Sequence, residues 1–261
     1  MMSKIREVFN EKKPLITYIS GGDPDLKMTE KLIYKLQTEG VDIIEVGIPF
    51  SDPLADGPTI QAASQRALKS GVTLENLIEK LAEIKDNIKV PIILMGYYNS
   101  ILNYGEKRFA NEISIAGISG VIIPDLPFDE RTNLSTSLKQ KSIDQIFLIT
   151  PNTSEERIKK NVKSSSGFLY TVAHLGITGE SNKENPLLKS YLSKVRKYSG
   201  DLPIGLGFGI DNQNKARRAA KHSDGIIIGS ALIKAIQAGD TEEEMLNNAG
   251  QFVKSIKEVM I

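Results

Sequence analysis

The 261-residue sequence contains no cysteine, which excludes disulfides, thiolate metal sites and cysteine nucleophiles together. Neither sign of charge is in excess, because 33 basic and 32 acidic side chains leave a net charge of +1; nothing therefore favours nucleic acid or an anionic membrane as a partner. No apolar run approaches the roughly 18 residues of a membrane span, and the start Met1–Arg6 lacks the apolar core of a signal peptide. We expect a soluble, cytoplasmic protein.

Short apolar runs recur along the chain and alternate with helical patterns. The runs are Leu15–Ile19, Ile43–Val46, Ile92–Met95, Gly120–Ile123, Ile146–Ile149, Phe168–Val172, Ile204–Leu206 and Gly225–Ile228. The helical candidates are Met28–Thr38, Leu74–Asn87, Lys107–Ala116, Thr132–Lys141, Ser154–Ser164, Pro186–Tyr198 and Asn212–His222. Most of the runs are continuously apolar, as expected for parallel strands that are covered on both faces. Thr73 is predicted to cap one helix, and Thr153 with Glu156 is predicted to form a capping box at another.

Eight strand-plus-helix units in a chain of this length match the (β/α)8 TIM barrel. A doubly wound sheet is the competing fold, but the turn after the first strand reads Gly21-Gly22-Asp23-Pro24 and lacks the glycine fingerprint of that fold. An additional N-terminal helix, Ser3–Glu11, is expected to cover the floor of the barrel. No linker composition interrupts the chain, so residues 1–261 are predicted to form a single TIM-barrel domain.

Acidic residues lie in and directly after the second predicted strand. Glu45 is inside the apolar run, where an ionised side chain is costly to bury. Acids at barrel strand ends are usually functional; the structural alternative is a carboxylate tied to backbone donors or to a neighbouring hydroxyl. Asp56 precedes Gly57-Pro58-Thr59, which predicts a helix start, so Asp56 is equally explained as a helix cap. Asp52 precedes a proline and is better explained as a turn former.

Other polar residues follow further strands and are expected at the same mouth of the barrel. They are Asp23, Tyr97, Asn99, Asp125, Tyr170 and Thr178. The two histidines are weaker candidates for catalysis, because His222 lies at a helix end and His174 is alone in a loop. No cluster of histidines and carboxylates has the spacing of metal ligands, so we expect no catalytic metal.

Glycine-rich turns follow the last two predicted strands. Gly205-Leu206-Gly207-Phe208-Gly209 ends the seventh, and Gly229-Ser230 opens the helix after the eighth. Barrels commonly hold a phosphate group there, on backbone N–H groups at a helix N-terminus. Gly176-Ile177-Thr178-Gly179 could close over the same anion. Tight turns alone would also explain these glycines, but their coincidence at both strand ends favours a phosphate site.

The motif from Glu45 to Gln61 resembles the signature of tryptophan synthase alpha subunits almost residue for residue. Further segments are similar to motifs of that family in the same order: Gly22-Asp23-Pro24, Tyr97-Tyr98-Asn99, Pro124-Asp125-Leu126-Pro127, Gly176-Ile177-Thr178-Gly179, Gly207-Phe208-Gly209 and Gly229-Ser230. The resemblance spans essentially the whole chain. It implies retro-aldol cleavage of indole-3-glycerol phosphate to indole and glyceraldehyde 3-phosphate, with indole passed to a pyridoxal-phosphate beta subunit in an alpha2-beta2 complex. It implies no cofactor in this chain.

The resemblance also implies residue roles. Glu45 would be the general acid/base that acts at C3 of the indole and at the side-chain hydroxyl. Asp56 would bind the indole N–H and stabilise the positive charge that develops there. Substrate-binding roles would fall to Tyr97, Tyr170, Thr178, Gly179, Gly209, Gly229 and Ser230: Tyr170 lines the indole pocket, while Gly179, Gly209, Gly229 and Ser230 hold the phosphate.

One position departs from the family pattern. The family often has Ser-Arg before the glycine-rich loop after the sixth strand, whereas this chain has Ala173-His174-Leu175, and we do not assume that His174 replaces the arginine. Two alternatives to the alpha-subunit assignment are a stand-alone indole-releasing lyase and a non-catalytic alpha-like subunit that only activates its partner.

Overall fold

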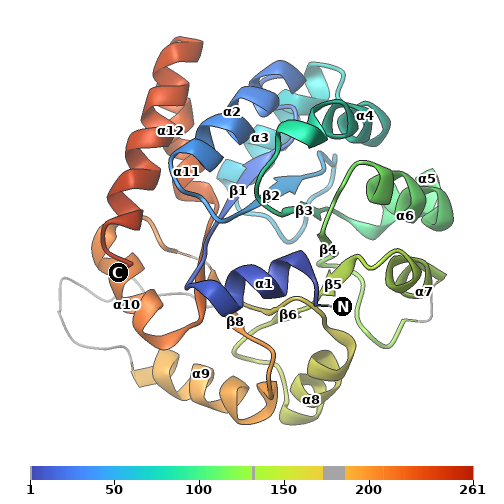
Figure 1. Ribbon diagram of the computed structural model, residues 1–261, viewed down its shortest axis with the longest axis vertical. Helices are drawn as coiled ribbons and strands as arrows, with labels where there is room; N and C mark the ends of the chain where they lie inside the picture. Colours follow the sequence, from blue (N-terminus) through green and yellow to red (C-terminus); the bar gives the residue numbers. More distant parts are fainter. Residues whose placement is uncertain (1, 131–132, 173–185, 208, 261) are drawn as a thin grey trace.

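A closed barrel of parallel strands organises the molecule. The computed structural model describes residues 2–130, 133–172, 186–207 and 209–260. Nine strands form one sheet in the order β5-β4-β3-β2-β1-β9-β8-β7-β6, and every pairing is parallel (Figure 1). Their bounds are β1 Leu15–Ser20, β2 Ile43–Gly47, β3 Ile92–Met95, β4 Gly120–Ile122, β5 Asp144–Ile146, β6 Leu148–Ile149, β7 Leu169–Val172, β8 Ile204–Gly207 and β9 Gly225–Ile228.

The ring closes through a broken fifth strand. β5 pairs with β4 and β6 pairs with β7, and only Phe147 separates β5 from β6. The Phe147 carbonyl accepts a hydrogen bond from the Tyr170 amide at 3.2 Å, so pairing continues across the break. If β5 and β6 are counted as one strand, the sheet has the eight strands of a (β/α)8 barrel, as the apolar runs predicted.

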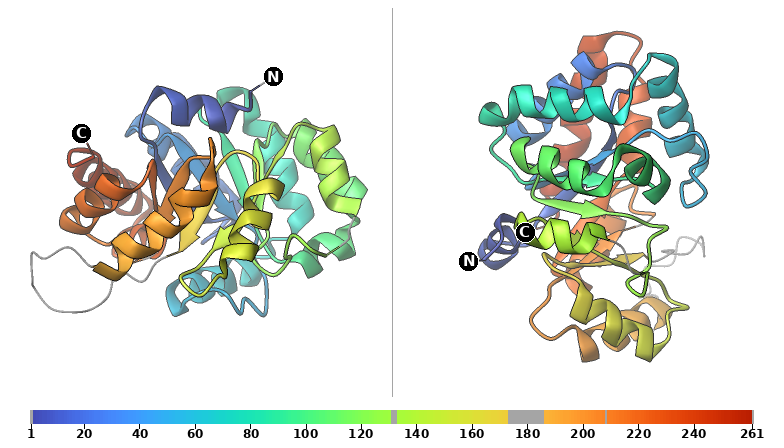
Figure 2. Two further views of the ribbon diagram at one scale, coloured as in Figure 1. Left: turned by 90° about the horizontal axis from the view of Figure 1, so that it is seen from below. Right: turned by 90° about the vertical axis from the view of Figure 1, so that its right-hand side faces the viewer.

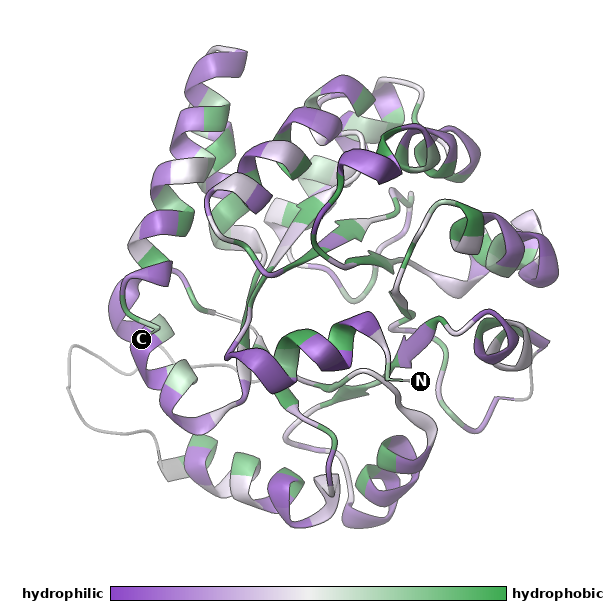
Figure 3. Cartoon of the chain, viewed as in Figure 1, coloured by the Kyte–Doolittle hydropathy of each residue, from purple (hydrophilic) through white to green (hydrophobic). Residues whose placement is uncertain are grey.

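Helices surround the strand ring on its outside (Figures 1 and 2). They are α2 Leu26–Thr38, α3 Pro58–Lys69, α4 Leu74–Ile84, α5 Tyr98–Tyr104, α6 Glu106–Ile115, α7 Asn133–Gln140, α8 Glu155–Ser164, α9 Pro186–Ser199, α10 Gln213–His222, α11 Ser230–Gln237 and α12 Glu242–Lys257, with a 3-10 turn at Lys85–Asn87. Their hydrophobic residues face the strands and their hydrophilic residues face outward (Figure 3). None of the helices in the described part of the chain is long and apolar enough to cross a membrane.

The two predicted helix caps differ in outcome. Thr73 caps α4 as expected, and its hydroxyl and the Asn76 side chain form a reciprocal capping box. The capping box predicted at Thr153 is wrong. Helix α8 is capped by Ser154, whose side chain accepts from the Arg157 amide, whereas the Thr153 hydroxyl accepts from the Thr150 amide and stabilises the preceding turn.

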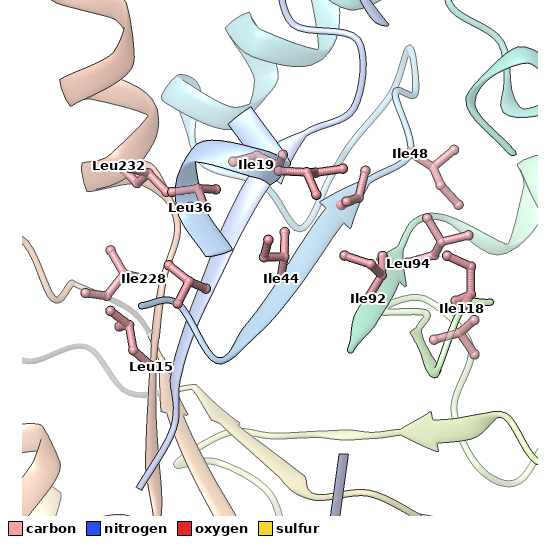
Figure 4. Close-up of a cluster of buried hydrophobic side chains, with 14 of the residues drawn as sticks. Leu15, Ile19, Leu36, Ile44, Ile48, Ile92, Leu94, Ile118, Ile228 and Leu232 are labelled. Carbon is pink, nitrogen blue, oxygen red and sulfur yellow. The ribbon is translucent and has the colours of Figure 1, made fainter. Parts of the chain in front are cut away.

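Residues on each strand alternate between two hydrophobic cores. Outward-facing side chains such as Ile44, Ile92 and Leu94 pack against the helices (Figure 4). Inward-facing side chains fill the barrel interior, and that set is Ile16, Ile43, Ile93, Ile122, Ile146, Phe168 and Ile227. Because side chains on a strand alternate with period two, Ile43 and Glu45 share the inner face. The inner face of β2 therefore changes from the apolar Ile43 to the carboxylate of Glu45, two residues closer to the carboxyl end of the strand.

The N-terminal helix α1, Lys4–Glu11, closes the floor of the barrel, as predicted. Its Ile5 is fully buried among the inward-facing side chains, and Val8 and Phe9 pack beside it. Two strand glycines make room for this helix. A side-chain carbon at Gly120 would lie 2.8 Å from Ile5 Cδ1, and one at Gly225 would lie 2.9 Å from the Phe9 ring. Helix α1 therefore covers the amino-terminal end of the barrel interior, opposite the carboxyl ends of the strands.

Candidate active site

Glu45 is buried inside the barrel near the carboxyl end of β2. It pairs in register with Tyr18 of β1 and Ile93 of β3. Its side chain has no solvent exposure, and neither carboxylate oxygen has a hydrogen-bond partner among the described residues. Burial raises the pKa of Glu45 to about 8, because the ionised form loses its hydration. The alternative that backbone donors satisfy this carboxylate is wrong for the described part of the chain.

Asp56 lies in the loop that connects β2 to α3. Its amide donates to the Pro53 carbonyl at 3.0 Å, and its own carbonyl accepts from the Gln61 side chain at 2.8 Å. The carboxylate accepts a hydrogen bond from the Tyr97 hydroxyl at 3.1 Å. Burial raises the pKa of Asp56, and the hydrogen bond from Tyr97 partly opposes that shift.

The alternative explanation of Asp56 as a helix cap is wrong. Helix α3 begins at Pro58, as predicted, but its N-cap is Gly57 and no side chain caps it. The Asp56 carboxylate faces Tyr97 instead. Asp52 behaves as the turn former that the sequence predicts: its carboxylate accepts from the Ser51 hydroxyl at 2.5 Å, and its carbonyl closes the turn with the Leu54 amide at 2.9 Å.

Tyr97, which directly precedes α5, holds the acidic loop through both its hydroxyl and its ring. The hydroxyl accepts from the Ala55 amide at 2.9 Å while it donates to Asp56. The ring stacks on Phe50 with centroids 5.1 Å apart and an interplanar angle of 23°. Tyr97 thus fixes the segment that carries Asp56, and its predicted contact with substrate stays a prediction.

Two tyrosines flank Glu45 on the inner face of the barrel. The Tyr18 hydroxyl lies directly over Gly47, where a side-chain carbon would be only 2.0 Å away from it. The Tyr170 ring lies over Gly207 in the same manner, at 3.0 Å. Burial raises the pKa of both phenols, and the nearby carboxylates raise it further, so both hydroxyls remain neutral donors. The inward position of Tyr170 agrees with its predicted role in the indole pocket.

Sequence reasoning missed Tyr18. The residue lies inside an apolar run and resembles ordinary core material. The signal that could have identified it is the two-residue period of a strand. Ile16, Tyr18 and Ser20 are every second residue of β1 and so share its inner face, and Ser20 is paired with Gly47 in register. Ser20 is buried, and its hydroxyl makes no hydrogen bond of ordinary geometry in the described part of the chain, although it lies near enough to the Tyr18 phenol to lower the pKa of that group. The end of β1 therefore contributes polar groups to the same interior.

The predicted phosphate-binding residues lie partly within the described structure. Gly229 is the N-cap of α11, and Ser230 is the first residue of that helix. The backbone N–H groups at such a helix start suit an anion. Gly229 also adjoins the barrel interior, because a side-chain carbon there would lie 3.4 Å from Tyr18 Cβ. Gly209 has φ +72 and so adopts a backbone conformation that favours glycine. Thr178 and Gly179 lie outside the described residues.

Two of the remaining polar residues predicted at the mouth, Asp23 and Asp125, have local partners, whereas Asn99 is exposed on α5. The Asp125 carboxylate accepts from the Tyr98 amide at 2.9 Å, and Asp23 is bound to a helix of the next unit. His222 ends α10, as predicted, whereas His174 lies outside the described residues. Within the described ranges, no group of three or more histidines, cysteines or acidic residues could hold a metal ion.

Together these features are typical of an acid/base enzyme on a (β/α)8 barrel. A buried carboxylate with a raised pKa, a second carboxylate held by a tyrosine, and a helix N-terminus suited to an anion share one mouth. Such a mouth can move a proton to and from an apolar, phosphate-bearing substrate.

The comparisons with known proteins identify the family. A family model described as tryptophan synthase alpha chain matches residues 5–260. The tryptophan synthase alpha chain of Petrotoga mobilis is 54% identical over 257 residues, which cover 98% of this chain and 99% of the relative. That of Dehalococcoides mccartyi is 43% identical over 255 residues, which cover 98% and 100%. The chain belongs to the tryptophan synthase alpha chain family.

Solved structures agree with this assignment. The crystal structure of tryptophan synthase subunit alpha from Legionella pneumophila is similar with a TM-score of 0.90 and 33% identity, covering 100% of this chain and 99% of that one. A crystal structure of tryptophan synthase from M. tuberculosis in an aminoacrylate-bound form gives 0.85 and 31%, covering 97% and 99%. The chain is thus a carbon–carbon lyase that cleaves indole-3-glycerol phosphate in tryptophan biosynthesis, with a tryptophan synthase beta subunit as its partner.

Proposed function

We propose that Glu45 and Asp56 carry out the proton chemistry of this cleavage in separate roles. The observation that supports the proposal most strongly is the complete burial of Glu45 without a partner among the described residues, which gives it a pKa of about 8. A carboxyl group with a pKa near the working pH can both donate and accept a proton. Asp56 is half-buried and hydrogen-bonded, so it suits a charge-stabilising role.

In the proposed mechanism Glu45 gives up one proton and takes one back in each cycle. Protonated Glu45 donates its proton to C3 of the indole, and the positive charge that develops on the ring nitrogen is stabilised by the Asp56 carboxylate. Glu45, now ionised, takes the proton of the side-chain hydroxyl as the carbon–carbon bond breaks. The bond electrons return to the indole ring, the hydroxyl carbon becomes the aldehyde of glyceraldehyde 3-phosphate, and Glu45 regains its proton.

Substrate binding is proposed to use the two ends of the same mouth. Tyr170 contacts the indole ring from β7, and Tyr97 borders the ring beside Asp56. The phosphate group binds at Gly229 and Ser230, with Gly209, Thr178 and Gly179 completing the site. Support comes from the position of Gly229 at the start of α11, next to Tyr18 and the barrel interior.

Isosteric substitutions test the two acids separately. Glu45→Gln and Asp56→Asn remove proton transfer while they keep side-chain shape, so each should lower the rate of indole release by about 100-fold or more. Indole release from indole-3-glycerol phosphate should be measured with and without a beta subunit. Asp52→Asn, in the same loop, is the matched control and should keep wild-type turnover without the beta subunit. Near-wild-type turnover of Glu45→Gln would overturn its proposed role.

The same assay separates the two alternative functions. A stand-alone lyase would show the same turnover with and without a beta subunit, and a non-catalytic alpha-like subunit would release no indole in either case.

We further propose an alpha2-beta2 complex and a cytoplasmic location, which the biosynthetic relatives support. We also propose that residues 1–261 form one domain, which the closure of the sheet through β9 and β1 supports.

A further inference from the structure

Helix α3 holds both ends of the segment that carries Asp56. In its first turn, the Gln61 side chain donates to the Asp56 carbonyl at 2.8 Å. One turn further on, the Ser64 hydroxyl contacts Phe50 twice, accepting from its amide at 2.8 Å and donating to its carbonyl at 3.0 Å. Segment 50–56 is therefore tied to this helix, and any shift of α3 moves Asp56 relative to the barrel.

Arg66 of the same helix makes a two-point ion pair with Asp23. Arg66 Nε lies 2.7 Å from Asp23 Oδ1, and its terminal nitrogen Nη2 lies 2.8 Å from Oδ2. The Asp23 side chain is only 10% exposed, whereas that of Arg66 is 38% exposed, so the carboxylate is shielded from water and the guanidinium is partly open to it. Bidentate arginine–carboxylate pairs fix orientation as well as distance, because two parallel bonds resist rotation.

The loop that carries Asp23 is itself rigidly seated. Asp23 follows β1, and the amide of the adjacent Gly22 donates to the Thr29 hydroxyl at 2.7 Å. Gly22 has φ +83, and a side-chain carbon there would lie 2.3 Å from Val72 Cγ2, just beyond the end of α3. The ion pair thus connects α3 to a closely packed loop at the end of the first barrel strand.

We propose that the Arg66–Asp23 pair is a positioning element of the reaction, which anchors α3 so that Asp56 stays at the indole nitrogen. The inference rests on the role proposed above for Asp56. Among the described residues, neither the Arg66 nor the Asp23 side chain is hydrogen-bonded to Glu45 or to the Asp56 carboxylate. Their effect reaches Asp56 through the contacts that Gln61 and Ser64 make.

The direct test is a double-mutant cycle with Asp56. Arg66→Gln should lower kcat for indole release by about 10- to 100-fold, with KM changed less than about threefold, because a small misplacement of a catalytic group is that costly. In the Asp56→Asn background, the same substitution should cost less than about threefold. Equal losses in both backgrounds would show a general structural role and overturn the proposal, as would a kcat for Arg66→Gln within about twofold of wild type.

Substitutions of Asp23 and a conservative substitution of Arg66 test the same ion pair in other ways. Asp23→Asn should match Arg66→Gln, and the double substitution should be no worse than either alone. Arg66→Lys keeps the charge but loses the two-point contact, so an intermediate loss is expected even if Arg66→Gln does not fold. Arg108→Gln is the matched control, because Arg108 also makes two ion-pair contacts, in its case with Glu112 and Glu75 on the outside of the molecule. Its kcat should equal that of the wild type.

Hydrogen exchange separates this inference from the proposed catalytic roles. In Arg66→Gln, amides in segment 50–57 should exchange faster than in wild type, whether or not Asp56 is catalytic. Unchanged exchange there would overturn the anchoring role. Faster exchange combined with full activity of Asp56→Asn would instead show that the anchoring is real and that the role proposed for Asp56 fails.

Discussion

Glu45 destabilises the fold that holds it. An acid with a pKa of about 8 in the folded protein and 4.5 as its ordinary value loses its proton more readily when the chain unfolds. Between these two pH values the unfolded chain is ionised at this position while the folded protein is not, so stability falls as pH rises. Below the lower value both forms are protonated and the penalty is absent. The role proposed for Glu45 therefore carries a cost in stability at neutral and alkaline pH.

Glu45→Gln should remove this pH dependence. The free energy of unfolding of the wild type should fall by about 3–5 kcal/mol more than that of the variant between about pH 5 and about pH 9. Urea unfolding at the two pH values measures the difference. Glu79→Gln, at an exposed position on α4, is the control and should follow the wild type. A wild type and a Glu45→Gln variant with parallel pH profiles would contradict the raised pKa.

Single residues differ in how far the sequence could predict them. Glu45 was identifiable because a carboxylate in an apolar run is unusual, and its position at a strand end follows from the strand count. The sequence explained Asp56 equally well as a functional acid or as a helix cap. The contact that distinguishes the two is with Tyr97, which lies in another unit more than forty positions away in the chain. Tyr18 could not be separated from core residues, because a buried tyrosine is common and only the partner strand reveals Gly47 beneath its hydroxyl.

At the scale of elements, helix α1 acts as the floor of the barrel. Ile5→Ala should lower the free energy of unfolding by about 2–5 kcal/mol, because it removes a fully buried side chain from the inner core. Ile115→Ala makes the same chemical change at a position that is 58% exposed, and its effect should stay within about 0.5 kcal/mol. Urea unfolding of both variants is the measurement. Equal effects would show that the floor contributes no packing.

The repeating strands and helices were predictable, whereas irregular features were not. Continuous apolar runs marked the strands because both faces of a parallel sheet are buried. The break at Phe147 lies where the pairing changes from β4 to β7, strands that are distant in the chain, so no local pattern predicts it. Helix α12 was not predicted, although the structure shows a capping box at Thr241 and Glu244. The Thr153 cap failed because its neighbour Ser154 competes for the same role one residue later.

At the scale of the whole molecule, closure of the ring joins distant parts of the chain. Removal of residues 225–261 would delete β9, α11 and α12 and leave β1 and β8 as unpaired edges. We expect this truncated chain to lose its near-UV circular dichroism and its cooperative thermal transition. A stably folded fragment of residues 1–224 would contradict the single-domain proposal. The full-length protein in the same buffer is the control.

The position of α1 also has a consequence for how the molecule is made. This helix is synthesised before the strands whose ends it covers. Ile5 can pack against Gly120, and Phe9 against Gly225, only after those later strands have been made. Contacts between such distant positions form slowly, since a long loop must close first. Until the later strands are made, the apolar face of α1 lacks part of its native packing and is open to wrong associations. Helix α1 is therefore expected to complete its packing only after the later strands are in place.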